Sequence, residues 1–204
     1  MFGQAMQRII ERLEYSNIPL STYNAVDIFA REGDWQTVAY AQHVGSLEAW
    51  EVDPSFINAL QANLPRAHVR CVDSYEEMKK AEHAHRYQFV VIDNPQNCFG
   101  VNREHCEHFD VFPEIFNMFA DHGYCIFNLN RQPFGFEKFP DWQQRRKEFY
   151  GREDVSYIPL PFFEEFYIKF FTNHGFKILS CRLESRGDYD HNDYLHYICL
   201  EWSR

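Results

Sequence analysis

Residues 25–37 read Ala25-Val26-Asp27-Ile28-Phe29-Ala30-Arg31-Glu32-Gly33-Asp34-Trp35-Gln36-Thr37, and the organisation of the chain follows from this stretch. Its first five residues predict a short apolar strand, and the residues after Gly33 predict a helix through Val38–Ala41. A glycine between the two lets the backbone turn sharply and leaves no side chain between the loop and a bound ligand. The stretch therefore predicts a strand, a ligand-binding turn and a helix, in that order.

The alternation of strands and helices continues along the chain. Seven apolar runs predict strands, at Ala25–Phe29, Leu47–Asp53, His68–Val72, Tyr87–Ile92, Tyr124–Leu129, Phe176–Leu183 and Tyr194–Glu201. The run Tyr87–Ile92 is apolar apart from Gln88, which is typical of a central parallel strand covered on both faces. Five strands alternate with helices, and a ten-residue loop, Glu184–Asp193, joins the last two strands. We therefore expect an α/β fold, a doubly wound, mostly parallel seven-stranded sheet with an antiparallel C-terminal edge and helices on both faces.

The segments between these strands supply the expected helices. The helical spacing of apolar residues predicts helices at 4–14, around Phe56–Leu64 and at Val111–Ala120. Tyr75–His85 is predicted to be a polar helix rich in Glu and Lys, and further helices are expected after Gly33 to about His43, at 141–150 and at Phe162–Asn173. Residues 96–108 are predicted to form a loop. No repeat, low-complexity stretch or linker composition divides the chain, so residues 1–204 are expected to form a single domain.

The segment 131–161 interrupts this regular pattern after the fifth strand. It is irregular and aromatic, with Phe134, Phe136, Phe139, Trp142, Phe149, Tyr150 and Tyr157. Its place on the ligand side of the sheet predicts a lid or acceptor-binding cap. A packing surface or a homodimer surface is the alternative.

The composition restricts the classes of partner. The 204 residues carry a net charge of −10 and have a pI near 5.4, which disfavours nucleic acid, and Arg145-Arg146-Lys147 is the only dense basic cluster. Twenty Phe, 12 Tyr and 4 Trp indicate a Phe-rich core or an aromatic pocket. Six scattered cysteines without a C-x-x-C pair and an acid-containing amphipathic N-terminus are typical of a cytoplasmic protein. No run of 18 apolar residues exists, so neither a membrane span nor a membrane partner is expected.

Acidic side chains follow the first four predicted strands. They are Asp27 at the first, Glu51 and Asp53 at the second, Asp73 after the third and Asp93 after the fourth. In a doubly wound sheet, ligands bind beyond the carboxyl ends of the strands. An acid at the end of the second strand, about twenty residues beyond a glycine turn, is placed to accept hydrogen bonds from two ribose hydroxyls.

At this point the chain resembles the class I S-adenosylmethionine-dependent methyltransferases. The matching motifs are Asp27-x-Phe29-Ala30-x-x-Gly33-x-x-x-Thr37, Trp50-Glu51-Val52-Asp53-Pro54, Val72-Asp73-Ser74 and Val91-Ile92-Asp93-Asn94-Pro95, within residues 25–129. The resemblance implies S-adenosyl-L-methionine as cofactor, with its methionine part at Asp27 and Gly33, its ribose at Glu51 and its adenine at Asp73 and Ser74. The full cofactor-binding set that it implies is Asp27, Phe29, Ala30, Gly33, Glu51, Val52, Asp73, Ser74 and Asp93.

The chain departs from the family pattern in two places. Arg31 and Glu32 stand where a second glycine is common, and Asp93-Asn94-Pro95-Gln96 lacks the second proline and the aromatic residue of the amine-modifying members. Asp73 has a plain structural alternative, since an aspartate at this position can cap the helix that begins at Tyr75.

Methyl transfer requires little chemistry from the protein beyond alignment and acceptance of a proton. Asp93, with Asn94 beside it, is the first candidate for a base or an acceptor-orienting group, and His105 or His108 is the second. The run His105-Cys106-Glu107-His108 lacks a second pair of ligands elsewhere, so we expect a surface loop there and no metal.

The sequence thus predicts a methyltransferase for a small or medium organic acceptor, with a hydroxyl of a sugar or natural product favoured over nitrogen. Two alternatives use the same fold: a non-catalytic module that binds the cofactor or a protein partner, and an N-methyltransferase for nucleic acid or protein. A nicotinamide enzyme is less favoured because the G-x-G-x-x-G spacing is absent.

Overall fold

The computed structural model describes residues 3–112, 114–187 and 194–204. The α-helices are α1 (Gln4–Tyr15), α2 (Thr37–Tyr40), α3 (Ile57–Asn63), α4 (Ser74–Glu77), α5 (Pro140–Tyr150) and α6 (Leu160–Asn173). The strands are β1 (Asn24–Asp27), β2 (Ser46–Glu51), β3 (His68–Cys71), β4 (Tyr87–Ile92), β5 (Cys98–Phe99), β6 (His105–Cys106), β7 (Phe119–Asn130), β8 (Lys177–Ser185) and β9 (Leu195–Ser203). Short 3₁₀ turns lie at Leu20–Thr22, Ala81–His83, Phe109–Val111, Glu114–Met118 and Phe136–Lys138.

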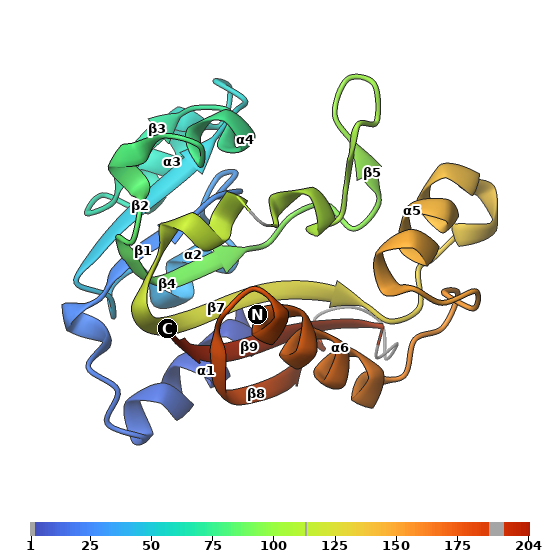
Figure 1. Ribbon diagram of the computed structural model, residues 1–204. Coiled ribbons are helices and arrows are strands. Elements are labelled where there is room, and N and C mark those ends of the chain that lie inside the picture. Colours follow the sequence, from blue (N-terminus) through green and yellow to red (C-terminus); the bar gives the residue numbers. More distant parts are fainter. Residues whose placement is uncertain (1–2, 113, 188–193) are drawn as a thin grey trace.

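Seven of the strands form one sheet in the order β3-β2-β1-β4-β7-β9-β8 (Figure 1). β1 pairs in parallel with β2 and β4, β2 with β3, and β4 with β7. β9 runs antiparallel to both β7 and β8. The prediction of a mostly parallel seven-stranded sheet with an antiparallel C-terminal edge is therefore confirmed.

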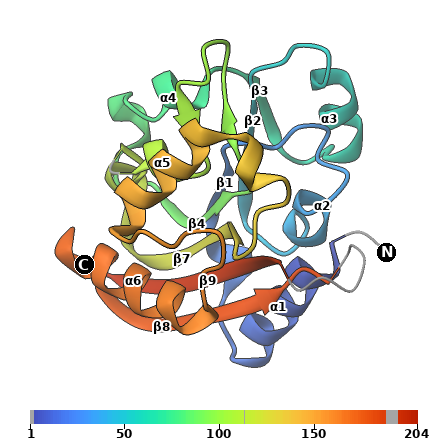
Figure 2. The ribbon, with the colours of Figure 1, turned by 90° about the vertical axis from the view of Figure 1, so that its right-hand side faces the viewer.

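Helices cover both faces of the sheet, and each face has its own hydrophobic core. Figure 2 shows α1, α2 and α3 on one side of the strands and α4, α5 and α6 on the other. Alternate residues of β4 divide between the two cores, with Val90 and Ile92 on the α6 side and Phe89 and Val91 on the α1 side. This alternation buries both faces of the central strand, as its apolar sequence predicts. Among the described residues, no helix has the length and apolar character needed to span a membrane.

The prediction of a helix at Val111–Ala120 is wrong. The chain forms two 3₁₀ turns here, and β7 begins at Phe119. Phe112 is extended, with φ −83° and ψ 142°, as expected for a residue before a proline, whose ring disfavours the helical conformation of the preceding residue. Phe112 and Phe116 still pack in the aromatic core, so the apolar spacing reflects burial without a helix.

The expected helix at Tyr75–His85 is also much shorter. α4 ends at Glu77, and a 3₁₀ turn follows at Ala81–His83. The Glu77 carboxylate bonds to His83 at 2.9 Å and pairs with Arg70 of β3 at 2.7 Å. Polar side chains of this segment thus pair with residues of the sheet. The segment buries few apolar groups, so little packing energy is available to stabilise a longer helix.

The turn between β1 and α2 depends on Gly33. Its φ is +68°, a left-handed conformation that side-chain-bearing residues adopt at a cost. A Cβ added there would lie 2.7 Å from Leu60 Cδ1 and 2.8 Å from Leu64 Cδ1, and both leucines are buried. The backbone conformation and the close packing against α3 therefore both require a glycine here, whether or not a ligand binds beside it.

We expect Gly33→Ala to lower the free energy of unfolding by roughly 2–4 kcal/mol, because a backbone cost adds to overpacking. Gly151→Ala is the matched control, since Gly151 has φ +63° but nothing within 4 Å of an added Cβ. It should lose only the backbone part, about 1–2 kcal/mol. Urea denaturation of both variants measures the difference, and equal losses would contradict the packing argument.

Candidate active site

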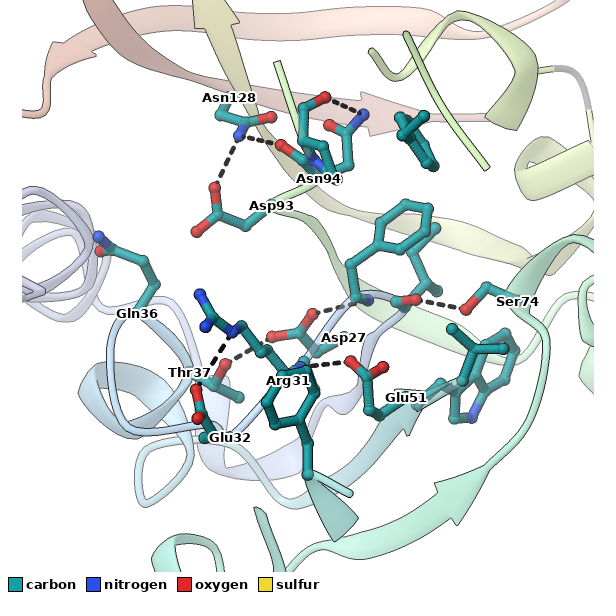
Figure 3. A pocket seen from close by; sticks show the side chains of 18 of the residues that line it. Asp27, Arg31, Glu32, Gln36, Thr37, Glu51, Ser74, Asp93, Asn94 and Asn128 are labelled. Atoms are coloured by element: carbon teal, nitrogen blue, oxygen red, sulfur yellow. Dashed lines mark hydrogen bonds and ion pairs between the residues drawn. The ribbon is translucent and has the colours of Figure 1, made fainter. Parts of the chain in front are cut away.

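A cavity of about 650 Å³ opens at the carboxyl ends of the parallel strands. This lies within the range of roughly 300–1,000 Å³ that is usual for small-molecule and cofactor sites. The strand-end acids Asp27, Glu51, Asp73 and Asp93 all line it, and Figure 3 shows three of them with hydrogen-bonded neighbours. The fold therefore brings together four of the five strand-end acids named from the sequence, and Asp53 is not among the lining residues.

Asp27 is the most buried of these acids. Its Oδ2 accepts hydrogen bonds from the hydroxyls of Thr37 and Tyr40, each at 2.7 Å, and its Oδ1 accepts one from the Phe29 N–H at 3.2 Å. Burial raises the pKa of Asp27 to about 6, although these hydrogen bonds act in the opposite direction. The carboxylate thus fixes both ends of the β1–α2 loop and is poised to ionise near neutral pH.

Glu51 is oriented by the backbone of the two neighbouring loops. Its Oε2 accepts from the Arg31 N–H at 2.9 Å and its Oε1 from the Asp53 N–H at 2.7 Å. Each carboxylate oxygen can accept a second hydrogen bond, so the pair of oxygens can still bind two hydroxyls of a ligand. Arg31 itself has φ +50°, so the loop adopts a left-handed conformation where the family more often has glycine.

The neighbouring Asp73 and Ser74 have structural partners. Asp73 Oδ1 accepts from the Tyr75 N–H at 2.9 Å and caps α4, which is the structural role that the sequence left open. The Ser74 hydroxyl donates to the Ile28 carbonyl oxygen and so ties α4 to the end of β1. Both residues still line the cavity, together with Phe29, Ala30, Gly33 and the exposed Val52.

Asp93 lies at the end of β4 among three donors. Its carboxylate accepts from Tyr197 Oη at 2.8 Å and from Asn128 Nδ2 at 2.8 Å, and it pairs with Arg186 at 3.3 Å. Tyr197 belongs to β9 and Asn128 to β7. The parallel neighbour β7 and the antiparallel strand β9 therefore both position the acid that the sequence identifies as the first catalytic candidate.

The Asp93 carboxylate also fixes the orientation of the neighbouring amides, because a carboxylate only accepts hydrogen bonds. Asn128 must face it with Nδ2, so Asn128 Oδ1 accepts from Gln96 Nε2 at 2.9 Å. Asn94 Nδ2 in turn faces the Pro95 carbonyl oxygen at 3.3 Å. Gln96 Oε1 and Asn94 Oδ1 are left buried without a hydrogen-bond partner among the described residues. Two residues of the cavity wall thus each carry a buried amide oxygen that no described group satisfies.

Comparison with solved structures finds the same fold over nearly the whole chain. M. jannaschii TYW2 in complex with AdoMet matches with a TM-score of 0.55 and 14% identity, over 100% of this chain and 78% of that one. N-methyltransferase NodS from Bradyrhizobium japonicum matches at 0.57 and 11%, over 97% and 94%. A Nostoc punctiforme protein with a provisional O-methyltransferase description matches at 0.56 and 18%, over 98% and 56%.

The fold is that of the class I methyltransferases. At these identities the likeness concerns the fold alone, so the resemblance seen in the sequence is confirmed at that level. No family model and no curated protein sequence matches the chain.

The two candidate histidines of this methyltransferase fold lie in different places. His105 lines the cavity and stacks on Tyr75, with ring centroids 3.6 Å apart. His108 lies outside the cavity, fully buried in the aromatic core, where its Nε2 bonds to the Tyr167 hydroxyl. Burial, with Arg146 nearby, lowers the pKa of His108 to about 3. The structure therefore keeps His105 as a candidate and does not support a catalytic role for His108.

The run 105–108 is also not the surface loop that the sequence predicts. His105 and Cys106 form β6, which pairs with β5 in an antiparallel hairpin. Glu107 is buried and binds Arg146 Nη1 at 2.5 Å and Trp142 Nε1 at 2.7 Å. The four side chains point to different partners and do not converge. Elsewhere in the described chain, Glu77, Glu82 and His83 lie close together, but Arg70 already contacts all three.

Residues of the β5–β6 hairpin belong to the wall of the cavity. Phe99, Gly100, Val101, Glu104 and His105 of the hairpin line it, whereas none of the lining residues comes from 131–161. Helix α5, which belongs to that segment, contacts the hairpin region through two ion pairs, Arg103–Asp141 at 2.6 Å and the buried Glu107–Arg146. A cap role for residues 131–161 stays a prediction. In the structure this segment contacts the hairpin, and the hairpin lines the cavity.

Many lining residues were not identified from the sequence, and three of them have polar side chains close to the acids. Gln36 is buried in the β1–α2 loop, and Tyr75 lies two residues after Asp73, which caps α4. Arg186 directly follows β8, and its guanidinium pairs with Asp93. A glutamine and a tyrosine carry no motif of their own. Arg186 is 93 residues from Asp93 in the sequence, and only the pairing of β8 and β9 brings it to the site.

Asp27 gives the stability a pH dependence. Its pKa is about 6 in the folded protein against 3.8 ordinarily, so the folded state holds the proton more tightly. The stabilisation is complete below pH 3.8 and is lost as the pH rises through 6. We expect the wild type to lose about 2 kcal/mol relative to Asp27→Asn between pH 4.5 and 7.5. Urea denaturation across this range measures the difference, and a constant gap between the two proteins would contradict the assignment.

Proposed function

We propose that the protein binds S-adenosylmethionine in this cavity and transfers its methyl group to an organic acceptor. The observation that carries the proposal is the charge of the lining, in a cavity at the ligand-binding edge of a methyltransferase fold. Seven carboxylates and two arginines line it: Asp27, Glu32, Asp34, Glu51, Asp73, Asp93 and Glu104, with Arg31 and Arg186. An acidic site favours a ligand with a positive sulfonium and an ammonium group.

The residues present fit the parts of this cofactor. Glu51 offers two oriented oxygens for the ribose hydroxyls, and the rings of Phe29, Tyr75 and Phe99 supply an apolar wall for the adenine. The loop from Asp27 to Gly33 would hold the methionine part. When bound, the cofactor supplies an activated methyl group, and the protein aligns the acceptor with it.

The acceptor would bind between Asp93 and the β5–β6 hairpin. We favour a small or medium acceptor with a hydroxyl, because the Asp93 carboxylate can orient the group and take its proton. The hairpin restricts the opening of the cavity, and the net charge of −10 disfavours nucleic acid as the acceptor.

A nitrogen acceptor is the second candidate, on one specific observation. The unpaired oxygens Asn94 Oδ1 and Gln96 Oε1 would both accept hydrogen bonds, and an amino group can donate more than one. Transfer of labelled methyl groups to matched amino and hydroxyl compounds separates the two acceptors. Cofactor binding without transfer to any compound of a cell extract would instead favour a non-catalytic module.

The acidic lining also argues against a nicotinamide dinucleotide, whose pyrophosphate is negatively charged. Equilibrium binding of S-adenosylhomocysteine and of NAD separates these two ligands directly. The proposal requires S-adenosylhomocysteine to bind the more tightly of the two.

We expect Glu51→Ala to weaken S-adenosylhomocysteine binding by one to two orders of magnitude, about 1.5–3 kcal/mol for hydrogen bonds to a charged group. Glu51→Gln, which keeps the shape and loses the charge, should fall between wild type and Glu51→Ala. Glu76→Ala, on the exposed side of α4, is the control and should bind as wild type does. Calorimetry measures the three affinities, and unchanged binding by Glu51→Ala would count against the whole site.

A further inference from the structure

Gln36 is the one lining residue whose side chain is almost fully buried and entirely without partners in the described parts of the chain. It is 2% exposed, and neither Oε1 nor Nε2 has a hydrogen-bond partner. The hydroxyl of its neighbour Thr37, in contrast, donates to Asp27 at 2.7 Å. Buried amide groups in folded proteins are nearly always hydrogen-bonded, because leaving them unpaired costs their desolvation. An unpaired amide on a cavity wall therefore indicates a group that a ligand satisfies.

The position of Gln36 limits which part of a ligand it can contact. Figure 3 shows Gln36 across the cavity from Glu51 and Ser74, with Arg31 and Glu32 on its own side. An adenosine bound at Glu51 and Ser74 would extend its 5′ substituent over Asp27 toward Gln36. Gln36 therefore lies at the end of the cavity opposite the nucleoside.

The chemistry of an amide selects the ligand group. Oε1 accepts and Nε2 donates, so the side chain matches a group that both donates and accepts. In the proposed cofactor, the α-amino acid end has this character, since its ammonium donates and its carboxylate accepts. A thioether or sulfonium sulfur has no hydrogen to donate and cannot satisfy Oε1.

We propose that Gln36 recognises the α-amino acid end of the cofactor, its Nε2 donating to the carboxylate and its Oε1 accepting from the ammonium group. This assignment rests on the proposed function of the cavity. It makes Gln36 a specificity residue that distinguishes a nucleoside with an amino acid tail from one without it. Arg31, which pairs with Glu32 at 3.2 Å on the same loop, adds a positive charge near the carboxylate.

The test compares two ligands that differ in this end alone. S-adenosylhomocysteine carries the amino acid, and 5′-methylthioadenosine keeps the nucleoside and sulfur without it. We expect Gln36→Met to weaken S-adenosylhomocysteine binding roughly 10- to 100-fold, as for a lost hydrogen bond to a charged group, and to leave 5′-methylthioadenosine binding within twofold of wild type. The Tm of the ligand-free variant should not fall, because methionine fills the same space without unpaired polar atoms. Gln61→Met, on the exposed side of α3, is the matched control.

A second variant gives an independent measurement. Gln36→Glu keeps the acceptor and replaces the donor with a negative charge. It should weaken S-adenosylhomocysteine binding but retain or improve binding of the decarboxylated analogue, which has the ammonium group and lacks the carboxylate.

The outcomes separate this inference from the proposed function. A wild type that binds neither ligand overturns both. A wild type that binds both ligands, with Gln36→Met weakening them equally or weakening neither, overturns the role of Gln36 and leaves the cofactor site standing. Selective loss of S-adenosylhomocysteine binding supports both.

Discussion

The buried carboxylate of Asp27 is the constraint on which the site depends. It accepts hydrogen bonds from Thr37 and Tyr40 of α2 and from the backbone of Phe29, so it joins the end of β1 to the start of the next helix. The loop between them turns at Gly33 with no room for a side chain against α3. The backbone N–H of Arg31 in the same loop orients Glu51 on the neighbouring strand. The buried Asp27 thus sets the geometry of Glu51. Burial opposes the ionisation of Asp27 and raises its pKa.

The remainder of the site comes from parts of the chain that are distant in sequence. Asp93 is held by Asn128 of the parallel strand β7 and by Tyr197 of the antiparallel strand β9, and the β5–β6 hairpin lines the cavity. The hairpin is supported in turn by α5 through the buried Glu107–Arg146 pair. A buried ion pair contributes little net stability, but removing one partner leaves an uncompensated charge. This pair therefore fixes where the hairpin lies relative to the sheet.

The sequence predicts the parts of this structure that local pattern determines. Apolar runs such as Tyr87–Ile92 identify the strands, and the acids at the ends of the first four strands identify the edge where the cavity opens. Local pattern fails where long-range contacts decide. The spacing of Phe112 and Phe116 is helical, yet the residue before a proline is extended and the two rings fill a core shared with α6. His108 is a candidate site residue in the sequence, but it is buried in the aromatic core against Tyr167 and is not among the residues that line the cavity.

The most direct test of the account is a crystal structure of the protein with S-adenosylhomocysteine. We expect ligand density in the cavity between the ends of β1, β2 and β4, with the ribose hydroxyls on Glu51 and the amino acid end toward Gln36. Density elsewhere on the protein, or a nucleoside whose ribose lies away from Glu51, would contradict it.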